Sequence, residues 1–126
     1  MITVNSLPAP YQSEVSNETQ VIVCDAPAAK GGSGAGFGAH QLLEAAFATC
    51  INMAIRMYAD QHSIALDHVS TTVWISKPDQ TRTCFNYEIE IVGDISDAER
   101  IKLEAVADSC PVRETLSRDL EFARQR

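Results

Sequence analysis

The longest stretch of helix-forming sequence in the chain runs from His40 to Ala59, HQLLEAAFATCINMAIRMYA. It contains no Pro or Gly and is rich in Ala, Leu, Met, Glu and Gln, which have high helix propensity. Its apolar residues cover most of the helix circumference, a pattern typical of a helix inside a protein core. Glu44, Asn52 and Arg56 interrupt the apolar run, which excludes a membrane span. The sequence therefore predicts one long, buried central helix.

Composition limits what such a helix can belong to. With 126 residues, 45% of them hydrophobic, the chain is expected to form one domain, residues 1–126. A net charge of −7 without a Lys/Arg cluster argues against nucleic acid or an anionic membrane as a partner, so a small ligand is expected. The N-terminal residues turn polar too soon for a secretory signal, which predicts a cytoplasmic protein. Four cysteines, none in a C-x-x-C pair, predict free thiols.

Short strand-like segments precede the helix. Residues 2–7, 11–15 and 19–24 mix β-branched with polar residues, and prolines or a Ser-Asn-Glu turn separate them. They predict a small antiparallel sheet within residues 1–25. Residues 26–38 form a Gly/Ala-rich loop with little to bury, so we expect it to be exposed and mobile unless the fold or a partner subunit pins it.

A hairpin and two further helices are predicted to complete a core of residues 39–126. Apolar and polar residues alternate over residues 69–76 and 84–91, which predicts a long hairpin with one face on the central helix. Ser96-Asp97-Ala98-Glu99 is a capping box that opens a helix ending near Ser109. The residues expected on its inward face are Ile101, Ala105 and Val106.

The chain is then expected to turn sharply at Cys110-Pro111. Proline favours the first position of a helix, so a short helix is predicted over residues 111–116 with Cys110 at its N-cap. Residues 119–126 are expected to form a last edge strand.

Cys50 and Cys110 are the candidate reactive thiols. At a helix N-terminus Cys110 meets backbone N–H groups and the positive end of the helix dipole, which favour the thiolate. In mid-helix Cys50 has no such help, and it is either a small hydrophobe of the core or a thiol ionised by a nearby cation. Cys24 and Cys84 are expected to be ordinary strand residues.

Three segments carry a resemblance to a known family: HQLLEAAFATCINMAIRMYA (residues 40–59), IVGDISDAER (residues 91–100) and ADSCPVRETLSR (residues 107–118). Their helix cysteine and later Cys-Pro-Val, in this order and separation, resemble the OsmC/Ohr family of bacterial thiol peroxidases, with this chain as a divergent member. The resemblance covers about residues 38–118.

The resemblance implies an α+β, OsmC-like fold in an intertwined homodimer, with a long central helix packed on curved antiparallel sheets and active sites at the subunit interface. It also implies an antioxidant peroxidase that reduces organic hydroperoxides or hydrogen peroxide without a metal or organic cofactor. Cys50 would become a sulfenic acid, and Cys110 would resolve it as a Cys50–Cys110 disulfide that a dithiol reductant later reduces.

The chain departs from the family pattern near this thiol. The peroxidases place an N-terminal arginine beside the reactive cysteine, held by a glutamate on the helix, but here no arginine precedes Arg56 and His40 takes the glutamate position. His40 and Glu44, at i and i+4, can pair, either to orient the imidazole or as a solvated pair at a helix start. Arg113, three residues after Cys110, is either a replacement for the missing arginine or a surface charge.

Three functions are compatible with these residues. The first is reduction of a hydroperoxide at Cys50. The second is a non-peroxidatic redox sensor, or a protein that binds a small molecule or thiol in the dimer-interface pocket, and the missing arginine favours it. The third is a metal site of His40, Glu44 and a cysteine, which lacks the usual ligand spacing, so no metal is expected.

Overall fold

The computed structural model describes the whole chain, Met1–Arg126, and its fold mixes helices with antiparallel strands. The chain divides into two units, Met1–Leu43 and Glu44–Arg126. The strands are β1 (Thr3–Ser6), β2 (Ser13–Ser16), β3 (Val21–Cys24), β4 (Leu66–Ser76) and β5 (Cys84–Gly93). The helices are α1 (Ala39–Gln61), α2 (Asp97–Val106) and α3 (Pro111–Leu116), with short 3-10 helices η1 (Ala28–Lys30) and η2 (Ala107–Ser109).

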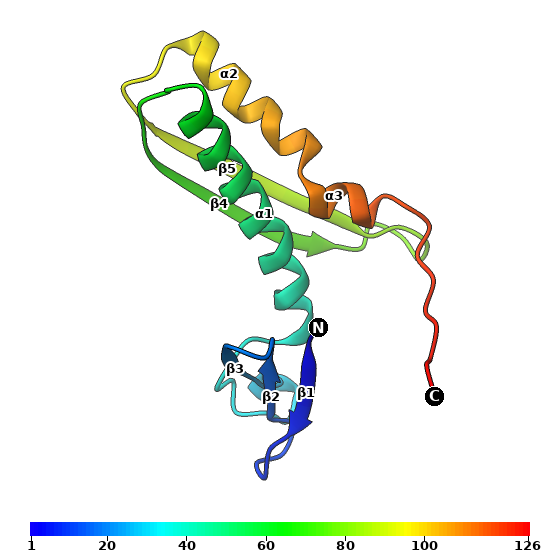
Figure 1. The fold of residues 1–126 in the computed structure, drawn as a ribbon. Helices are drawn as coiled ribbons and strands as arrows, with labels where there is room; N and C mark the ends of the chain where they lie inside the picture. Colours follow the sequence, from blue (N-terminus) through cyan, green and yellow to red (C-terminus); the bar gives the residue numbers. More distant parts are fainter. The chain divides into compact units, whose positions relative to one another are not determined.

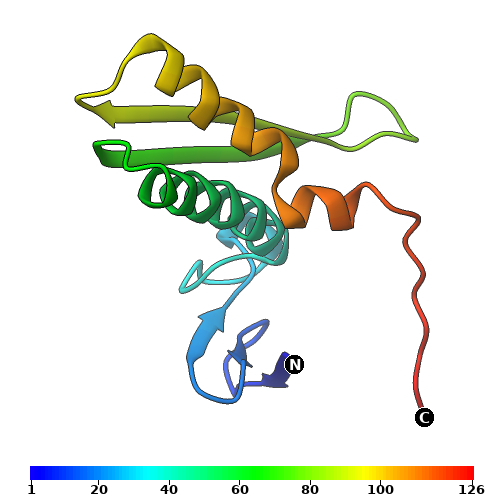
Figure 2. The same ribbon diagram turned by 45° about the horizontal axis from the view of Figure 1, so that its top comes forward.

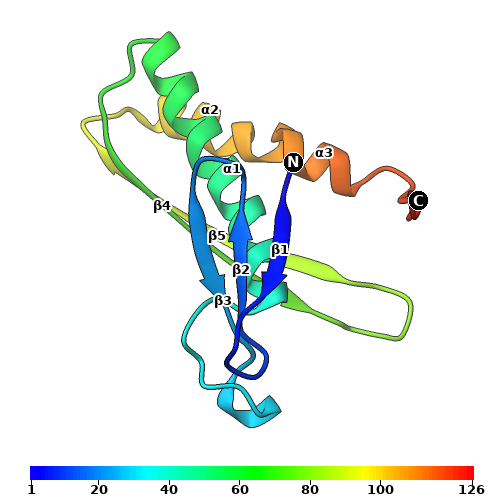
Figure 3. The ribbon, with the colours of Figure 1, turned by 60° about the horizontal axis from the view of Figure 1, so that its bottom comes forward.

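The first unit is built on a three-stranded antiparallel sheet in the order β1-β2-β3 (Figure 3). Val15 in the middle strand pairs with Val4 on one side and Ile22 on the other. The predicted N-terminal sheet is confirmed, with strands shorter than the predicted segments because turns use the segment ends. The Leu7 N–H, for example, bonds to the Gln12 carbonyl in the turn between β1 and β2.

One buried carboxylate, Asp25, pins the glycine-rich loop. Its Oδ2 accepts hydrogen bonds from the Ser33 hydroxyl at 2.6 Å and from the Ser33 and Ala35 N–H groups, both at 3.1 Å. The Gln12 amide adds a longer bond of 3.4 Å. The Ser33 hydroxyl is the main cause that lowers the pKa of Asp25 to about 2, against the raising effect of burial. Asp25 is therefore ionised at neutral pH, and its hydrogen bonds hold the glycine-rich loop without a partner subunit.

The second unit is organised on the hairpin of β4 and β5, which pair antiparallel from Leu66 to Ser76. Val69 lies opposite Ile91 and Val73 opposite Tyr87, so the two apolar faces predicted from the alternation coincide. Figure 1 shows α1 and α2 lying along this hairpin. The predicted hairpin is thereby confirmed.

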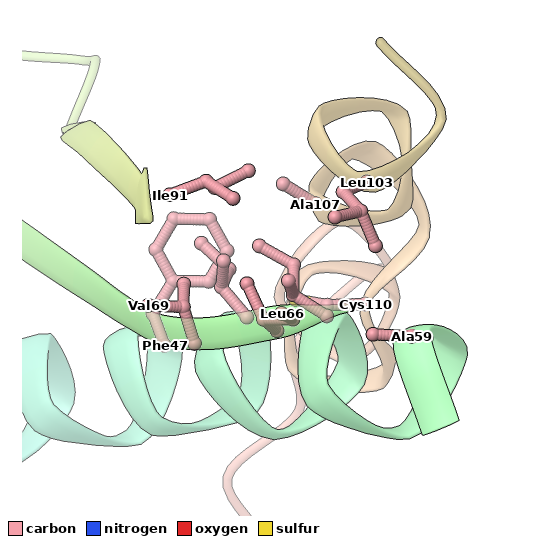
Figure 4. Packing of buried hydrophobic residues seen from close by; sticks show 10 residues of the cluster. Phe47, Ala59, Leu66, Val69, Ile91, Leu103, Ala107 and Cys110 are labelled. Carbon is pink, nitrogen blue, oxygen red and sulfur yellow. The ribbon is translucent and has the colours of Figure 1, made fainter. Parts of the chain in front are cut away.

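A single apolar cluster fills the space between the hairpin and the helices of this unit. The Phe47 ring meets Phe85 and Tyr87 edge-on, with ring centroids 5.8 and 5.5 Å away. Each fully buried aliphatic side chain contributes about 1.5–3 kcal/mol through the hydrophobic effect. Figure 4 shows how side chains from the different elements meet in the cluster, whose buried members are Phe47, Ile51, Ile55, Ala59, Leu66, Val69, Ile91, Leu103, Ala107 and Cys110.

The inward face of α2 differs from the predicted one. Leu103 is fully buried, and Ala107 in η2 is buried beside it, whereas Ile101 is 66% exposed. The prediction of Ile101 as an inward residue was wrong because the i, i+4 line that faces the core runs through Leu103 and Ala107. The capping box itself is present, since Ser96 and Glu99 exchange their side-chain and backbone hydrogen bonds.

In the single chain α1 is buried along one face only. Phe47, Ile51, Ile55 and Ala59 face the cluster. A second line of α1, which we call the exposed stripe, consists of Ala46, Cys50, Met53 and Met57. Cys50 lies at its border, since it is half-buried and still packs against the cluster. Met53 and Met57 are 51% and 55% exposed, so the prediction of a helix buried all round does not describe the isolated chain. Met53 and Met57 therefore mark the side of α1 that the single chain leaves largely exposed.

The polar residues that interrupt the apolar run of α1 bind the backbone of β4. Asn52 Nδ2 donates to the Val69 carbonyl at 2.9 Å. The Arg56 guanidinium donates to the carbonyls of Leu66 at 2.8 Å and Asp67 at 3.2 Å. These bonds give hydrogen-bond donors to carbonyls of β4 that would otherwise have to bond to water. Asn52 and Arg56 therefore attach α1 to the edge of the hairpin.

The C-terminal part of the chain follows the prediction as far as α3. Figure 2 shows α2 turning into α3, after which the chain runs on without a helix or strand. Phe122 is 92% exposed. The predicted edge strand at residues 119–126 is not formed, because no strand of this chain lies beside them to share hydrogen bonds. No helix in the structure combines the length and apolar character needed to cross a membrane.

Candidate functional site

The second unit brings Cys50 and Cys110 together at the start of α3. Cys50 lies on α1, and its Sγ accepts a hydrogen bond from the Val112 N–H, 62 residues further along, at 3.5 Å. Cys110 is the N-cap residue of α3, and its Sγ accepts from the Arg113 N–H at 3.4 Å. Both cysteines are free thiols. Two successive N–H groups of one helix start are thus shared between the two sulfurs.

The hydrogen bond that Cys50 accepts from the start of α3 was not predicted from the sequence. Pro111 has no N–H, so the first free donors of α3 come from Val112 and Arg113. Pro111 signals the helix start, but nothing local to Cys50 shows that this start lies against α1. The expectation that Cys50 meets no N–H group of a helix start is therefore wrong.

The two thiols have different surroundings. Cys110 is buried, with 1% of its surface exposed, whereas Cys50 is half-buried and belongs to the exposed stripe. Burial raises the pKa of the Cys110 thiol, and Cys50 beside it adds to the rise, while the N–H groups of Arg113 and Val112 oppose it. The helix N-terminus was expected to favour the Cys110 thiolate, but desolvation outweighs it and the pKa of Cys110 is raised.

The side chain of Arg113 does not reach either sulfur. Its guanidinium forms an ion pair with Asp108, donating to Oδ1 at 3.2 Å. It also donates a hydrogen bond to the Tyr87 hydroxyl at 3.4 Å. The Tyr87 hydroxyl in turn donates to Asp108 Oδ1 at 3.2 Å. We call these three residues the Tyr87 cluster. Sequence reasoning identified neither Tyr87 nor Asp108, since no motif links a strand residue to η2.

No hydrogen bond joins the other candidate residues to the two thiols or to the Tyr87 cluster. His40 is exposed in the first turn of α1, and Glu44 is half-buried one turn later. Their supporting role stays a prediction. Cys24 is buried in the first unit, and Cys84 is exposed on β5, where its thiol donates to Asn86 Oδ1 at 3.4 Å. No group of three or more His, Cys, Asp or Glu side chains is placed to hold a metal ion.

Two open clefts between α1 and β4 include neither thiol. The larger, of about 350 Å³, is lined by Asn52, Met53, Arg56, Met57, His68 and Val69. The smaller, of about 280 Å³, is lined by Ala48, Thr49, Asn52, Met53 and Thr71. Both are shallow in the single chain, so the paired cysteines are the better candidate for chemistry.

Comparison with known proteins identifies a family whose model covers the part of the chain that carries the two cysteines. The family model described as OsmC-like protein matches residues 31–123, which include both thiols. The chain belongs to the OsmC-like protein family. No curated protein matches the chain, so the membership rests on the family model and on solved structures.

Solved OsmC-like structures share the fold at low sequence identity. An OsmC-like protein from Mycoplasma pneumoniae is 22% identical with a TM-score of 0.75, covering 92% of this chain and 85% of that one. An organic hydroperoxide resistance protein from Legionella pneumophila is 23% identical with a TM-score of 0.63, covering 93% and 89%. The organic hydroperoxide resistance protein OhrB of Bacillus subtilis is 20% identical with a TM-score of 0.53, covering 93% and 90%.

Proposed function

We propose that this OsmC-like protein is a thiol-dependent peroxidase that reduces organic hydroperoxides or hydrogen peroxide in the cytoplasm. The observation that carries the proposal is the meeting of Cys50 and Cys110 at the start of α3, with a partly exposed thiol beside a buried one. Family membership supports it, because two of the structural neighbours are described as hydroperoxide resistance proteins. The reaction needs no metal or organic cofactor.

The proposed reaction has three steps: oxidation of Cys50, formation of the disulfide, and its reduction. The Cys50 thiolate attacks the hydroperoxide, the O–O bond breaks, and a proton completes the alcohol leaving group, which leaves Cys50 as a sulfenic acid. The Cys110 thiolate then attacks the Cys50 sulfur, and the hydroxyl leaves as water while the disulfide forms. A dithiol reductant finally returns both cysteines to thiols and becomes a disulfide itself.

The surroundings of the two thiols suit these different roles. Cys50 is the more accessible sulfur of the two, and the Val112 N–H donates a hydrogen bond to it. Cys110 stays protonated in the resting state because burial and the neighbouring Cys50 raise its pKa. Conversion of Cys50 to an uncharged sulfenic acid removes the repulsion between the two sulfurs, so Cys110 ionises more readily at the moment when it is needed.

The proposal also places a second copy of the chain against α1. The exposed stripe repeats every three to four residues, the spacing of a seam between packed helices. Met53 and Met57 are each more than half exposed on it, and Cys50 lies on the same line. A homodimer that buries the stripe would form a pocket for a small hydroperoxide or thiol directly at Cys50.

The dimer is tested by replacing both methionines of the stripe with glutamate. We expect sedimentation to show a dimer for the wild type and a monomer for Met53→Glu/Met57→Glu, because two buried carboxylates are too costly to desolvate. Ile101→Glu is the matched control, since Ile101 is a 66% exposed apolar residue on another helix. A monomeric wild type, or equal dissociation of the control, would contradict the proposed interface.

Peroxidase activity is tested by stopped-flow consumption of cumene hydroperoxide with a dithiol reductant. We expect Cys50→Ser to lower the rate by about 10³-fold or more, because a hydroxyl is a much weaker nucleophile than a thiolate and cannot become a sulfenic acid. Cys84→Ser is the matched control, since it makes the same change at an exposed cysteine on β5. A wild-type rate no higher than that of Cys50→Ser would eliminate the peroxidase.

A second function is favoured by one observation: the Arg113 guanidinium binds Asp108 and Tyr87 instead of Cys50. A non-peroxidatic redox sensor, or a protein that binds a small thiol or other small molecule in the dimer-interface pocket, has no need of a guanidinium that polarises a departing oxygen. The same experiment separates the two functions. A sensor reacts once with hydroperoxide and does not turn over, and a binding protein does not consume it.

A further inference from the structure

We infer that the Tyr87 cluster positions Cys110 for attack on the oxidised Cys50 sulfur. The inference rests on the proposed function for its biological use, but its geometry and its test concern only the formation of the Cys50–Cys110 disulfide. In this scheme Tyr87, Asp108 and Arg113 touch neither the substrate nor the sulfurs through their side chains. They act through the turn that carries Cys110.

The cluster brackets Cys110 in the sequence and ties the turn to the sheet. Asp108 precedes Cys110 by two residues and Arg113 follows it by three. The two side chains meet at 3.2 Å, and both meet the hydroxyl of Tyr87 on β5, at 3.2 Å from Asp108 and 3.4 Å from Arg113. The turn at Cys110 is therefore closed by three mutual contacts and cannot swing away from β5 without breaking them.

Tyr87 also connects the turn to the helix that bears Cys50. Its ring packs edge-on against Phe47 with centroids 5.5 Å apart, and Phe47 lies one turn before Cys50 on α1. Phe47 is buried and fixed in the core. Tyr87 thus joins two elements, with its ring on Phe47 of α1 and its hydroxyl on the two residues that flank Cys110.

The position of α3 depends on contacts with the rest of the chain. It has six residues, and an isolated helix of this length is not stable in water. Yet its first N–H groups are bonded to Cys50 and Cys110, so the place of this turn sets the distance and direction between the sulfurs. Disulfide exchange requires one sulfur to approach the other in line with the breaking bond, and small displacements are costly for such reactions.

The test forms the disulfide without a hydroperoxide. The full chain is mixed with oxidised glutathione, so that the Cys50 thiolate displaces one glutathione thiolate and leaves a Cys50–glutathione mixed disulfide. The Cys110 thiolate then attacks Cys50, the second glutathione leaves as a thiolate, and the protein disulfide forms. Mass spectrometry of acid-quenched samples measures the two steps separately.

We expect Arg113→Ala, Asp108→Asn and Tyr87→Phe each to lengthen the life of the mixed disulfide, by about tenfold for Arg113→Ala. Formation of the mixed disulfide is expected to stay within about twofold of the wild type, which a general loss of stability would not produce. Arg113→Lys restores a cation opposite Asp108 and is expected to recover part of the loss.

Glu114→Gln is the matched control. It removes the 3.0 Å ion pair between Glu114 on the same short helix and Arg118 in the segment that follows it, and neither side chain bonds to the Tyr87 cluster. Wild-type resolution in all three cluster variants, or equal slowing in Glu114→Gln, would overturn the inference. Because no peroxide is used, a chain without peroxidase activity would still give a clear answer on the cluster.

Discussion

Replacement of Leu103 by alanine is expected to lower the free energy of unfolding by about 3 kcal/mol. Leu103 is fully buried on α2 and belongs to the cluster between α2, α1 and the hairpin. Truncation removes its apolar contacts and leaves a cavity that the surrounding helices fill only in part. Equilibrium unfolding in guanidinium chloride, followed by circular dichroism, measures the change.

Ile101→Ala is the matched control for this loss. It truncates a side chain of similar size two residues earlier on the same helix, at a position that is 66% exposed. Its effect is expected to stay below about 0.5 kcal/mol, as for other surface substitutions. If Ile101→Ala were the more destabilising of the two, the inward face of α2 assigned here would be incorrect.

Cys110→Ser is expected to stop peroxidase turnover after one reaction and to leave Cys50 as a long-lived sulfenic acid. Steady-state turnover should fall by about 10²-fold or more, because a serine hydroxyl cannot form the disulfide. Serine is a preferred N-cap residue and can accept the Arg113 N–H as Cys110 does, so α3 should keep its start. Dimedone trapping with mass spectrometry measures the sulfenic acid.

The pH dependence of the wild type gives a second check on Cys110. The raised pKa means that little of its thiol is ionised at neutral pH, so disulfide formation should accelerate as the pH rises towards 9.0. Cys84→Ser, with the same atom change on β5, should follow the wild type.

The turnover of Cys110→Ser could also contradict the proposed role of Cys110. A Cys110→Ser protein that turns over at the wild-type rate would show that another thiol or the reductant resolves Cys50.

Elements with local signals were predictable from the sequence. The capping box at Ser96 and Glu99, the proline at the first position of α3 and the alternation of the hairpin each act within a few residues. The OsmC-like motifs added the pairing of Cys50 with Cys110 as an expectation. In the first three cases the residues that carry the signal lie close together in the sequence, whereas the cysteine pairing came from the resemblance.

The missed features depend on contacts between distant segments. The bond from Val112 to Cys50 and the burial of Cys110 come from the packing of α3 against α1, and burial raises the pKa of the Cys110 thiol that the helix N-terminus was expected to lower. The inward line through Leu103 was likewise missed, because Ile101 is as apolar and only the neighbours of α2 distinguish them. The failure at residues 119–126 has the same origin, since a strand pattern needs an edge to pair with.

The loop around Asp25 has a consequence for sequence tolerance. A Cβ at Gly32 would lie 1.9 Å from the Ala26 carbonyl oxygen, and one at Gly36 would lie 2.0 Å from that of Val23, closer than real Cβ atoms come. Even alanine, the smallest side chain, would push the backbone of the loop apart at either position. A segment whose composition suggests an adaptable spacer thus contains two positions, Gly32 and Gly36, that leave no room for a side chain. Libraries or insertions intended to vary this protein should leave it intact.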